Sequence, residues 1–527
     1  MTNGSEYLQR FKQAAAAFDA RDDASLAAFA IVADEVAAAL ASDSDLRFYF
    51  GDDPSIWPAL RKLWRDLSRA QLTFWDTSED DEEARDDGEQ QRAMKVACVS
   101  LARFTRNLVA AVPYNQEQAY ENEPEIRRLL HYFTSWSATE DADAVMAARM
   151  LTQTLSNIVT GNESLMSAIW DTYLALPEDQ VVLLRLLAHP DPRTVLSSLI
   201  FMFNVLRGCK MRIKALCTTP IGLRLCVVLL NLMTASFDAQ EDTDTGRAFN
   251  YGYFIFTQIA QQGCVPRLYI RLAMDGETVT PHQTTLLKLT DSYLQSADPP
   301  ERNAVHEGLM PMLSQVFFSL SASARASVSK SVGSGGGDAS APPAELDVML
   351  PKVCEALVLL TQCIVSVALA AEGQERDPLG RRKFFAEARS DGTGIVESIV
   401  DLLRLLDLFL PRINFGKPVR QPGAPSAPSP DNPGFSYLKR DLVRLLGVLA
   451  HRSRSVQDRV RQCGGIQTVM NLCVVDERNP YLREHAIFSL HSLLEGNPEN
   501  QAVVDATQPV READENGVLK PVRVPTA

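Results

Sequence analysis

Histidine and cysteine are the residue types in this sequence best suited to catalysis or metal binding. His485 and His491 stand six residues apart, whereas two histidines that share a metal on one helical face are three or four residues apart. The nine cysteines include no C-x-x-C pair, and most fall within apolar segments. The spacing therefore predicts no metal site and favours buried, reduced thiols.

Sequence motifs for enzymatic chemistry are also missing. The chain contains no G-x-S-x-G, no H-E-x-x-H, no Walker loop and no kinase signature. A nucleophile and its base are set by three-dimensional geometry, but the seven histidines are scattered and suggest no pairing. We therefore predict no catalytic residue, no cofactor and no enzymatic activity.

The segments that carry these residues have the apolar spacing of amphipathic α-helices. In 485–501 one helical face is predicted by apolar residues at i, i+3 and i+7, namely Ile487, Leu490 and Leu494. Gly496 follows where a left-handed glycine would end the helix. Alternating strand patterns and hairpin signals are scarce. The chain is therefore predicted to be nearly all α-helical.

Similar helical segments recur along the chain, each interrupted by one small or polar residue. The steps from Asn107 to Asn157, from Asn157 to Asn204 and from Gly447 to Ser492 are 50, 47 and 45 residues. Periods of about 40–47 residues are typical of armadillo and HEAT repeats. We predict an all-α, armadillo/HEAT-like right-handed α-solenoid with degenerate repeats and two disordered insertions.

The asparagines that interrupt three of these segments are the candidate partner-binding residues. On the inner helix of an armadillo repeat, an asparagine side chain can bond to the backbone of an extended peptide. Asn107, Asn157 and Asn204 are therefore predicted to contact protein partners. The alternative, which the sequence favours, is that each asparagine caps or bridges neighbouring helices internally.

Changes in composition predict the domain organisation. The predicted order is N-terminal helices at 1–76, an acidic linker at 77–92, armadillo-like helical repeats at 93–320, a Ser/Gly-rich linker at 321–345, helical repeats at 346–415, a Pro-rich linker at 416–434, a C-terminal armadillo-like domain at 435–506 and a flexible tail at 507–527. The Ser/Gly-rich and Pro-rich segments are the two predicted insertions, because they hold too few apolar residues to form a core.

Charge and hydropathy exclude two classes of partner. The formal net charge is −14, and a nucleic-acid binder would instead be expected to carry a basic surface. The start of the chain lacks the layout of a signal peptide. The longest apolar run, 356–371, is interrupted by Thr, Gln and Ser and is predicted to be a buried helix. We expect no nucleic-acid binding and no membrane insertion.

The block 435–506 carries an ordered set of motifs. These motifs are Leu438-Lys439, Gln457-Asp458, Gly465-Ile466, Asn479-Pro480-Tyr481-Leu482, Glu484-His485-Ala486-Ile487 and Asn497-Pro498-Glu499-Asn500-Gln501. In their order and spacing they resemble the C-terminal domain of the ataxin-10 family. The resemblance implies an armadillo-like fold and a cytoplasmic scaffold without catalytic activity, linked to cytokinesis through protein partners. Each motif is also explained by folding alone.

Two function hypotheses follow from this pattern. The leading one is an adaptor that holds protein partners on its curved surface, with self-association left open. The alternative is a cargo-binding adaptor of nuclear-import type, in which an inner-groove tryptophan is followed four residues later by asparagine. None of the five tryptophans has an asparagine at that spacing, which counts against the alternative.

Overall fold

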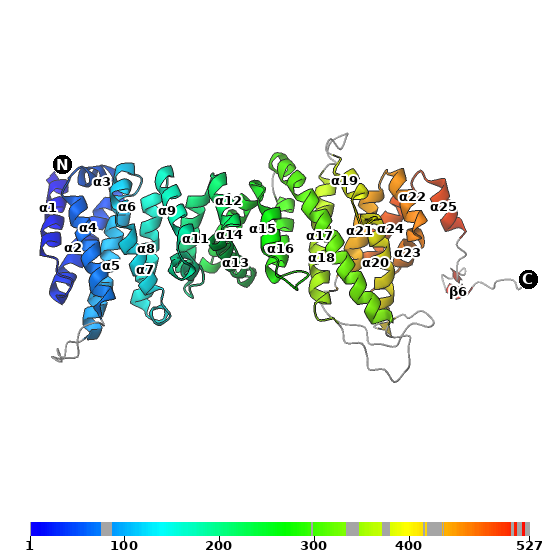
Figure 1. The fold of residues 1–527 in the computed structure, drawn as a ribbon, viewed down its shortest axis with the longest axis horizontal. Helices are drawn as coiled ribbons and strands as arrows, with labels where there is room; N and C mark the ends of the chain where they lie inside the picture. Colours follow the sequence, from blue (N-terminus) through cyan, green and yellow to red (C-terminus); the bar gives the residue numbers. More distant parts are fainter. Residues whose placement is uncertain are drawn as a thin grey trace, which may run out of the picture. The chain divides into compact units, whose positions relative to one another are not determined.

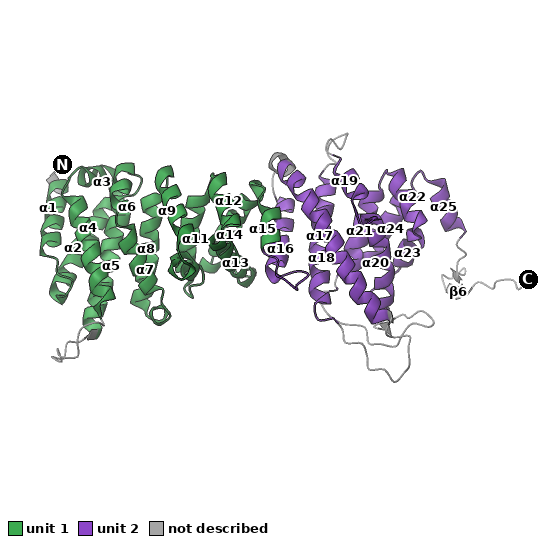
Figure 2. Cartoon of the chain, in the orientation of Figure 1, with its two compact units in different colours: residues 1–271 green, residues 272–527 purple. Residues whose placement is uncertain are grey.

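The computed structural model describes most of the chain. The described residues are 2–74, 87–296, 299–333, 347–370, 380–414, 417–418, 435, 437–506, 511–513 and 519–521. They form two compact units, residues 1–271 and residues 272–527, which Figure 2 shows in different colours. Each unit is a stack of α-helices. The predicted all-α, armadillo/HEAT-like solenoid fold is therefore confirmed.

Unit 1 contains helices α1 to α15 (Figure 1). Their bounds are α1 Thr2–Ala17, α2 Asp23–Ser42, α3 Ser44–Gly51, α4 Ile56–Leu72, α5 Asp87–Leu108, α6 Pro113–Tyr120, α7 Glu123–Phe133, α8 Ala142–Val159, α9 Glu163–Ala175, α10 Val182–Leu187, α11 Pro192–Leu206, α12 Lys210–Thr218, α13 Pro220–Ala235, α14 Asp244–Gln261 and α15 Val265–Arg271. Two short 3₁₀ helices are Ser137–Glu140 and Glu178–Gln180.

The helices of unit 1 follow the three-helix pattern of armadillo repeats. The repeats are α3–α4–α5, α6–α7–α8, α9–α10–α11 and α12–α13–α14. The third helices α2, α5, α8, α11 and α14 pack side by side in one continuous row. The second helices α4, α7, α10 and α13 form another row. Each repeat therefore contacts mainly its neighbours, as solenoid repeats do.

Unit 2, taken by itself, has a similar pattern with less regular repeats. Its helices are α16 Pro281–Ser296, α17 Pro299–Gly333, α18 Leu350–Leu369, α19 Arg381–Glu387, α20 Ile395–Phe409, α21 Leu438–Ala450, α22 Arg454–Gln462, α23 Gly465–Leu472, α24 Leu482–Leu494 and α25 Pro498–Asp505. The third-helix row is α16, α18, α21 and α24, and α17, α20 and α23 form the second row. Helices α19, α22 and α25 take the place of first helices.

Three short antiparallel strand pairs occur among the described residues of unit 2. The strands are β1 Arg389–Ser390, β2 Thr393–Gly394, β3 Ile413–Asn414, β4 Lys417–Pro418, β5 Arg511–Ala513 and β6 Leu519–Pro521. The pairs are β1–β2, β3–β4 and β5–β6. They connect or follow helices and add no layer to the fold.

Most third helices end in the same way. After α5, α8, α11, α14, α21 and α24 the chain turns through one residue with positive φ, and these residues are Ala111 (58°), Gly161 (81°), Gly208 (73°), Gly263 (67°), Arg452 (52°) and Gly496 (65°). Glycine adopts this left-handed conformation without the steric penalty of a Cβ atom. The helix end predicted at Gly496 is confirmed.

The predicted Ser/Gly-rich linker at 321–345 is wrong in its first part, because α17 continues to Gly333. Leu320, Ala324 and Val328 are all nearly fully buried, and their spacing of three or four residues places them on one helical face. The many serines of this segment hid that apolar stripe from an interpretation based on composition. Residues 334–346 lie outside the described part of the chain.

The other predicted linkers fall largely outside the described residues. Helix α5 begins at Asp87, inside the predicted acidic linker at 77–92. Strand β4 lies within the predicted Pro-rich linker at 416–434. Strands β5 and β6 pair within the predicted tail at 507–527. The remaining residues of the three segments are not described.

Two described helices, α2 and α18, are long and apolar enough to cross a membrane by length and composition. The bent pair α12 and α13 would pass the same test as one span. Helix α18 contains most of the apolar run at 356–371, and it packs against α16, α17 and α21. The prediction of a buried helix at this place is confirmed.

Candidate functional site

The three candidate asparagines lie at equivalent places on the third helices of successive repeats. Asn107 is on α5, Asn157 on α8 and Asn204 on α11. The Nδ2 atom of Asn107 donates to the main-chain oxygen of Ala37 at 2.8 Å. The Nδ2 atom of Asn157 donates to the main-chain oxygen of Arg106 at 3.1 Å. Each amide therefore bridges to the preceding third helix.

Asn204 repeats this bridge with side-chain acceptors. Its Nδ2 atom lies 3.1 Å from Oγ1 of Thr160 and 3.5 Å from Oγ of Ser156, both on or next to α8. The sequence favoured internal bridging over partner contact, and the Nδ2 atoms of all three asparagines do bridge helices. Their Oδ1 atoms distinguish them from one another.

The Oδ1 atoms of Asn157 and Asn204 accept no hydrogen bond from a described residue, and both side chains are only half-buried. Asn107 differs, because it is 9% exposed and its Oδ1 atom accepts from Nε of Arg106 at 3.1 Å. An asparagine whose Nδ2 is fixed by a neighbouring helix presents its Oδ1 in a defined orientation. Asn157 and Asn204 therefore keep an acceptor available to a partner's N–H group.

Next to Asn204, three aromatic side chains form a cluster across α11 and α14. The ring of Phe203 lies 5.8 Å from that of Tyr251 and 5.9 Å from that of Phe254, and Tyr251 and Phe254 are 5.7 Å apart. Phe254 is 47% exposed, and the Arg207 guanidinium lies 6.0 Å from the centre of the Phe203 ring. Such a cluster offers apolar area together with a cation.

Two arginines in this region form no ion pair with a described carboxylate. Arg106 donates to Oε1 of Gln153 at 2.6 Å, and Arg207 contacts the Phe203 ring. Burial lowers the pKa of Arg106, with a smaller contribution from the positive charge of Arg103. By contrast, Arg149 on α8 lies 2.9 Å from Asp191. The region thus carries positive charge that no described acid balances.

We call this surface the third-helix face. Its residues are Arg106, Gln153, Asn157, Phe203, Asn204, Arg207, Tyr251 and Phe254. The spacing of asparagines indicated only part of it. Phe203 is only half-buried, and the sequence offered no signal for its contact with Tyr251 and Phe254, which lie one repeat further along the chain.

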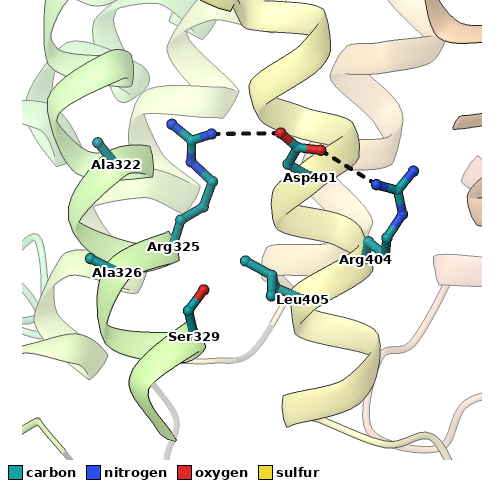
Figure 3. A pocket seen from close by; sticks show the side chains of 7 residues that line it. All are labelled: Ala322, Arg325, Ala326, Ser329, Asp401, Arg404 and Leu405. Atoms are coloured by element: carbon teal, nitrogen blue, oxygen red, sulfur yellow. Dashed lines mark hydrogen bonds and ion pairs between the residues drawn. The ribbon is translucent and has the colours of Figure 1, made fainter. Parts of the chain in front are cut away.

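A second surface feature is a shallow groove between α17 and α20 in unit 2. Figure 3 shows Arg325 and Arg404 on either side of Asp401, with Ser329 and Leu405 below. The Asp401 carboxylate lies 3.7 Å from Arg325 and 3.5 Å from Arg404. Arg404 also donates to the main-chain oxygen of Cys463 at 2.6 Å. The guanidinium groups of Arg325 and Arg404 carry the positive charge that a small anion would need. Both already pair with the Asp401 carboxylate.

Among the chemistry-bearing residues, Cys217 lies within side-chain hydrogen-bonding reach of Cys226 and Cys264. All nine cysteines are free thiols, and burial raises the pKa of Cys354 to about 12, so its reactive thiolate form is disfavoured. Within the described ranges, no group of three or more His, Cys, Asp or Glu residues could hold a metal ion. His485 is half-buried, and burial lowers its pKa.

The motif residues of the C-terminal block form a buried hydrogen-bond network. Asn497 and Asn500 are fully buried, and Gln457 is 2% exposed. The Nδ2 atom of Asn497 donates to Oε1 of Gln457 at 3.1 Å. The Nδ2 atom of Asn500 donates to the main-chain oxygen of Leu493 at 2.8 Å. These bonds join α22, α24 and α25, which supports the interpretation that the motifs serve folding.

Asn479 does not cap the helix that follows it. Helix α24 begins at Leu482, and Tyr481 precedes it in a left-handed conformation. Asn479 instead donates from Nδ2 to Oδ2 of Asp476 at 2.7 Å. The Asn-Pro pair therefore shapes the loop before the helix.

The same C-terminal block is similar to a known protein family. A family model described as "Spinocerebellar ataxia type 10 protein domain" matches residues 438–526. The ataxin-10 homolog of Dictyostelium discoideum is 38% identical over 82 residues, which are 16% of this chain and 13% of that protein. Residues 438–526 therefore form an ataxin-10-type domain. The resemblance of the block 435–506 is thereby confirmed.

The ataxin-10 similarity is confined to a part of each protein. Ataxin-10 of Bos taurus is 30% identical over 112 residues, which are 21% of this chain and 23% of the bovine protein. The matched part therefore spans less than a quarter of either relative's length. The family model covers residues 438–526, and the third-helix face of unit 1 lies outside them.

Solved structures resemble the chain only weakly. The crystal structure of SYS-1 covers 94% of both chains with a TM-score of 0.32 and 13% identity. An engineered protein covers 92% of this chain and 98% of its own with a TM-score of 0.34 and 14% identity. Likeness of this degree does not define the fold, which the three-helix repeats define by themselves.

Proposed function

We propose that this ataxin-10 family member is a non-enzymatic armadillo scaffold that binds extended segments of protein partners along its third-helix face. The observation that carries the proposal is the arrangement of Asn157, Asn204 and the aromatic cluster on consecutive third helices. Two oriented acceptor atoms, Oδ1 of Asn157 and of Asn204, lie in a row that continues into exposed aromatic area.

The geometry indicates how such a segment would be held. An extended peptide has main-chain N–H groups that lack intrachain partners, and the two Oδ1 atoms can accept from them. The ring of Phe254 offers a surface to one apolar or aromatic side chain of the partner. Interface binding energy is usually concentrated in a few residues of this kind.

The charges on the face favour an acidic segment. Arg106 and Arg207 have no ion-pair partner among the described residues, and opposite charge on the partner would speed encounter and fix register. The proposed partner segment is therefore extended and acidic, with one apolar side chain aligned to the aromatic cluster.

The cellular role that we propose follows from ataxin-10 family resemblance. A cytoplasmic location and a part in the regulation of cytokinesis are supported by that resemblance alone. We further propose that the chain associates with copies of itself. A nuclear-import type of cargo binding stays the alternative, and no contact in the described structure favours it.

Selection of peptides from a random displayed library against the full-length chain tests this function. We expect enriched peptides to be acidic and to contain an aromatic or aliphatic residue. N204A and F254A should each weaken their binding more than about 10-fold, the loss typical of central contact residues. M211A is a matched control, because Met211 is 70% exposed on α12 and lies outside the third-helix face.

The controls make the outcome decisive. Circular dichroism and thermal melting of each variant must match the parent chain, so that a loss of binding reports on the face. Enriched peptides that bind N204A and F254A as well as the parent would overturn this proposal. So would a selection in which no sequence class is enriched against correctly folded protein.

A further inference from the structure

Acidic residues are absent from two long stretches of unit 1. The chain has a formal net charge of −14, yet neither 192–237 nor 245–274 contains an Asp or a Glu. The nine basic residues of these stretches are Arg193, Arg207, Lys210, Arg212, Lys214, Arg224, Arg247, Arg267 and Arg271. A chain that is acidic overall thus gathers positive charge in the part that forms α11 to α15.

Five of these nine cations form no ion pair with an acid among the described residues. The other four pair with carboxylates from outside the two stretches, as Arg224 does with Glu178 at 2.8 Å. The five without such a partner are all exposed, and they are Arg207, Lys210, Lys214, Arg267 and Arg271. Apart from Arg207, which contacts the Phe203 ring, all of them belong to α12 and α15.

Helices α12 and α15 pack against each other and bring these cations together. The pKa of the Cys264 thiol is raised, mainly by a hydrogen bond with another cysteine, and the charges of Arg267 and Lys210 both oppose this rise. Both cations therefore lie near the same sulfur atom, one from each helix. Lys214 is one helical turn from Lys210, and Arg271 is one turn from Arg267. The positive charges thus form one continuous group.

Two large apolar side chains stand among these cations. Met211 is 70% exposed and Ile270 is 66% exposed, so neither lies in a groove. Met211 directly follows Lys210, and Ile270 directly precedes Arg271. We call this surface the basic edge, and its residues are Lys210, Met211, Lys214, Arg267, Ile270 and Arg271.

We propose that the basic edge binds the surface of an anionic lipid bilayer. Its lysines and arginines attract the anionic headgroups, and Met211 and Ile270 enter the boundary between headgroups and acyl chains. A protein partner would need a shaped pocket for each of these protruding side chains. The headgroup region of a bilayer is fluid and takes them up without one. The chain rests on the surface in this way and does not cross it.

The net charge of the chain restricts the contact to this edge. At physiological ionic strength, exposed charges more than about 8 Å apart are largely screened from each other. The acidic surfaces elsewhere therefore repel the bilayer only where they come close to it. Helix α12 begins at Lys210 without a side-chain cap, so the N–H groups of its first turn add to the positive potential of the edge.

Sedimentation of the full-length chain with lipid vesicles tests the proposal. We expect binding to vesicles of equal amounts of phosphatidylcholine and phosphatidylserine, none to phosphatidylcholine alone, and weaker binding as salt is added. K214Q and R267Q should each weaken binding about fivefold, the effect of one cation near an anionic surface. M211A should weaken it severalfold, because an apolar side chain no longer enters the bilayer.

Two variants in the same unit are matched controls. R224Q also removes one arginine charge, but this arginine already pairs with Glu178. F237A also removes an exposed apolar side chain, since Phe237 is 67% exposed, but Asp238 follows it and the residue is outside the basic edge. Both should bind vesicles as the parent chain does. Circular dichroism verifies that every variant is folded.

The remaining outcomes overturn the proposal. One is a lack of binding to the anionic vesicles, and another is an equal loss in K214Q and R224Q, which would show attraction by charge in general. Binding to polyglutamate but not to vesicles, weakened by K214Q and R267Q, would assign the edge to an acidic protein instead. N204A and F254A should bind vesicles normally, so the result is independent of peptide binding to the third-helix face.

Discussion

The Nζ atom of Lys439 donates a hydrogen bond to the main-chain oxygen of Leu410 at 2.6 Å, although the lysine side chain is only 1% exposed. The same Nζ lies 3.2 Å from Oδ1 of Asp407. Burial lowers the pKa of Lys439, against the opposing effect of the Asp407 carboxylate. This lysine joins the end of α20 to the start of α21.

Replacing Lys439 by methionine should destabilise unit 2. K439M keeps most of the side-chain volume but leaves Asp407 and the Leu410 carbonyl without their donor. Breaking a buried pair in this way costs about 3–5 kcal/mol, and the partial exposure of Asp407 places the expected loss at the lower end. Urea denaturation measures it. K383M on the exposed side of α19 should change stability little, and equal stabilities of the two variants would contradict the role of Lys439.

The left-handed residues after the third helices give a paired prediction. Ala111 has φ 58°, and Gly208 has φ 73° with open space where a Cβ would lie. A non-glycine residue in this conformation costs about 1–2 kcal/mol. A111G should therefore stabilise the protein by about 1 kcal/mol, and G208A should destabilise it by a similar amount. Differential scanning calorimetry compares both with the parent, and melting shifts of the same sign would refute the argument.

The ion pair between Glu397 and Arg459 predicts a pH dependence of stability. Their atoms lie 2.6 and 2.8 Å apart in a two-pronged contact, and the hydrogen bond from Arg459 lowers the pKa of Glu397 below its ordinary value of 4.5. Its stabilising contribution is complete above the unfolded pKa and is lost as pH falls through the lower folded value. E397Q should be less stable by about 1 kcal/mol at pH 7.

The difference between parent and E397Q should shrink as the pH is lowered below about 4.5, which denaturant titrations at pH 7, 5 and 3.5 would follow. E387Q is the control, because Glu387 is 66% exposed and lies 3.9 Å from Lys383. A gap between parent and E397Q that stays constant across this range would disprove the ion-pair account.

The helical course of α17 through residues 321–333 is open to a simple test. Val328 is fully buried and Ser329 is exposed. V328D would bury a charge and should cost about 3 kcal/mol, whereas S329D should be nearly neutral. Thermal melting measures both. Two neutral substitutions would instead indicate the linker that the composition suggested.

The spacing of apolar residues predicted the class of fold well, because helical periodicity survives even in degenerate repeats. Gly496 marked a helix end correctly, since a left-handed turn requires little beyond the glycine itself. The buried helical stripe that contains Val328 was missed, because a segment rich in alanine and serine has the composition of a linker. The same small residues can also be buried where helices pack together.

The candidate site was predicted only in part. Asn157 and Asn204 were found because they interrupt apolar segments at a regular period. The aromatic cluster could not be predicted, because Phe203 and Tyr251 meet only after α11 and α14 pack side by side. Ile487 is 46% exposed and was assigned to the wrong side of α24, since a wide apolar surface on both sides of a helix leaves its orientation undetermined in sequence.

The row of third helices also bears on how the chain is made. Within each unit, every third helix after the first packs against the one before it, so a repeat emerging from the ribosome finds its docking surface already present. Unit 1 can complete its own core while unit 2 is still being synthesised. Domains folding in order of translation spend less time with exposed apolar helices, and for a solenoid of this length that limits aggregation during synthesis.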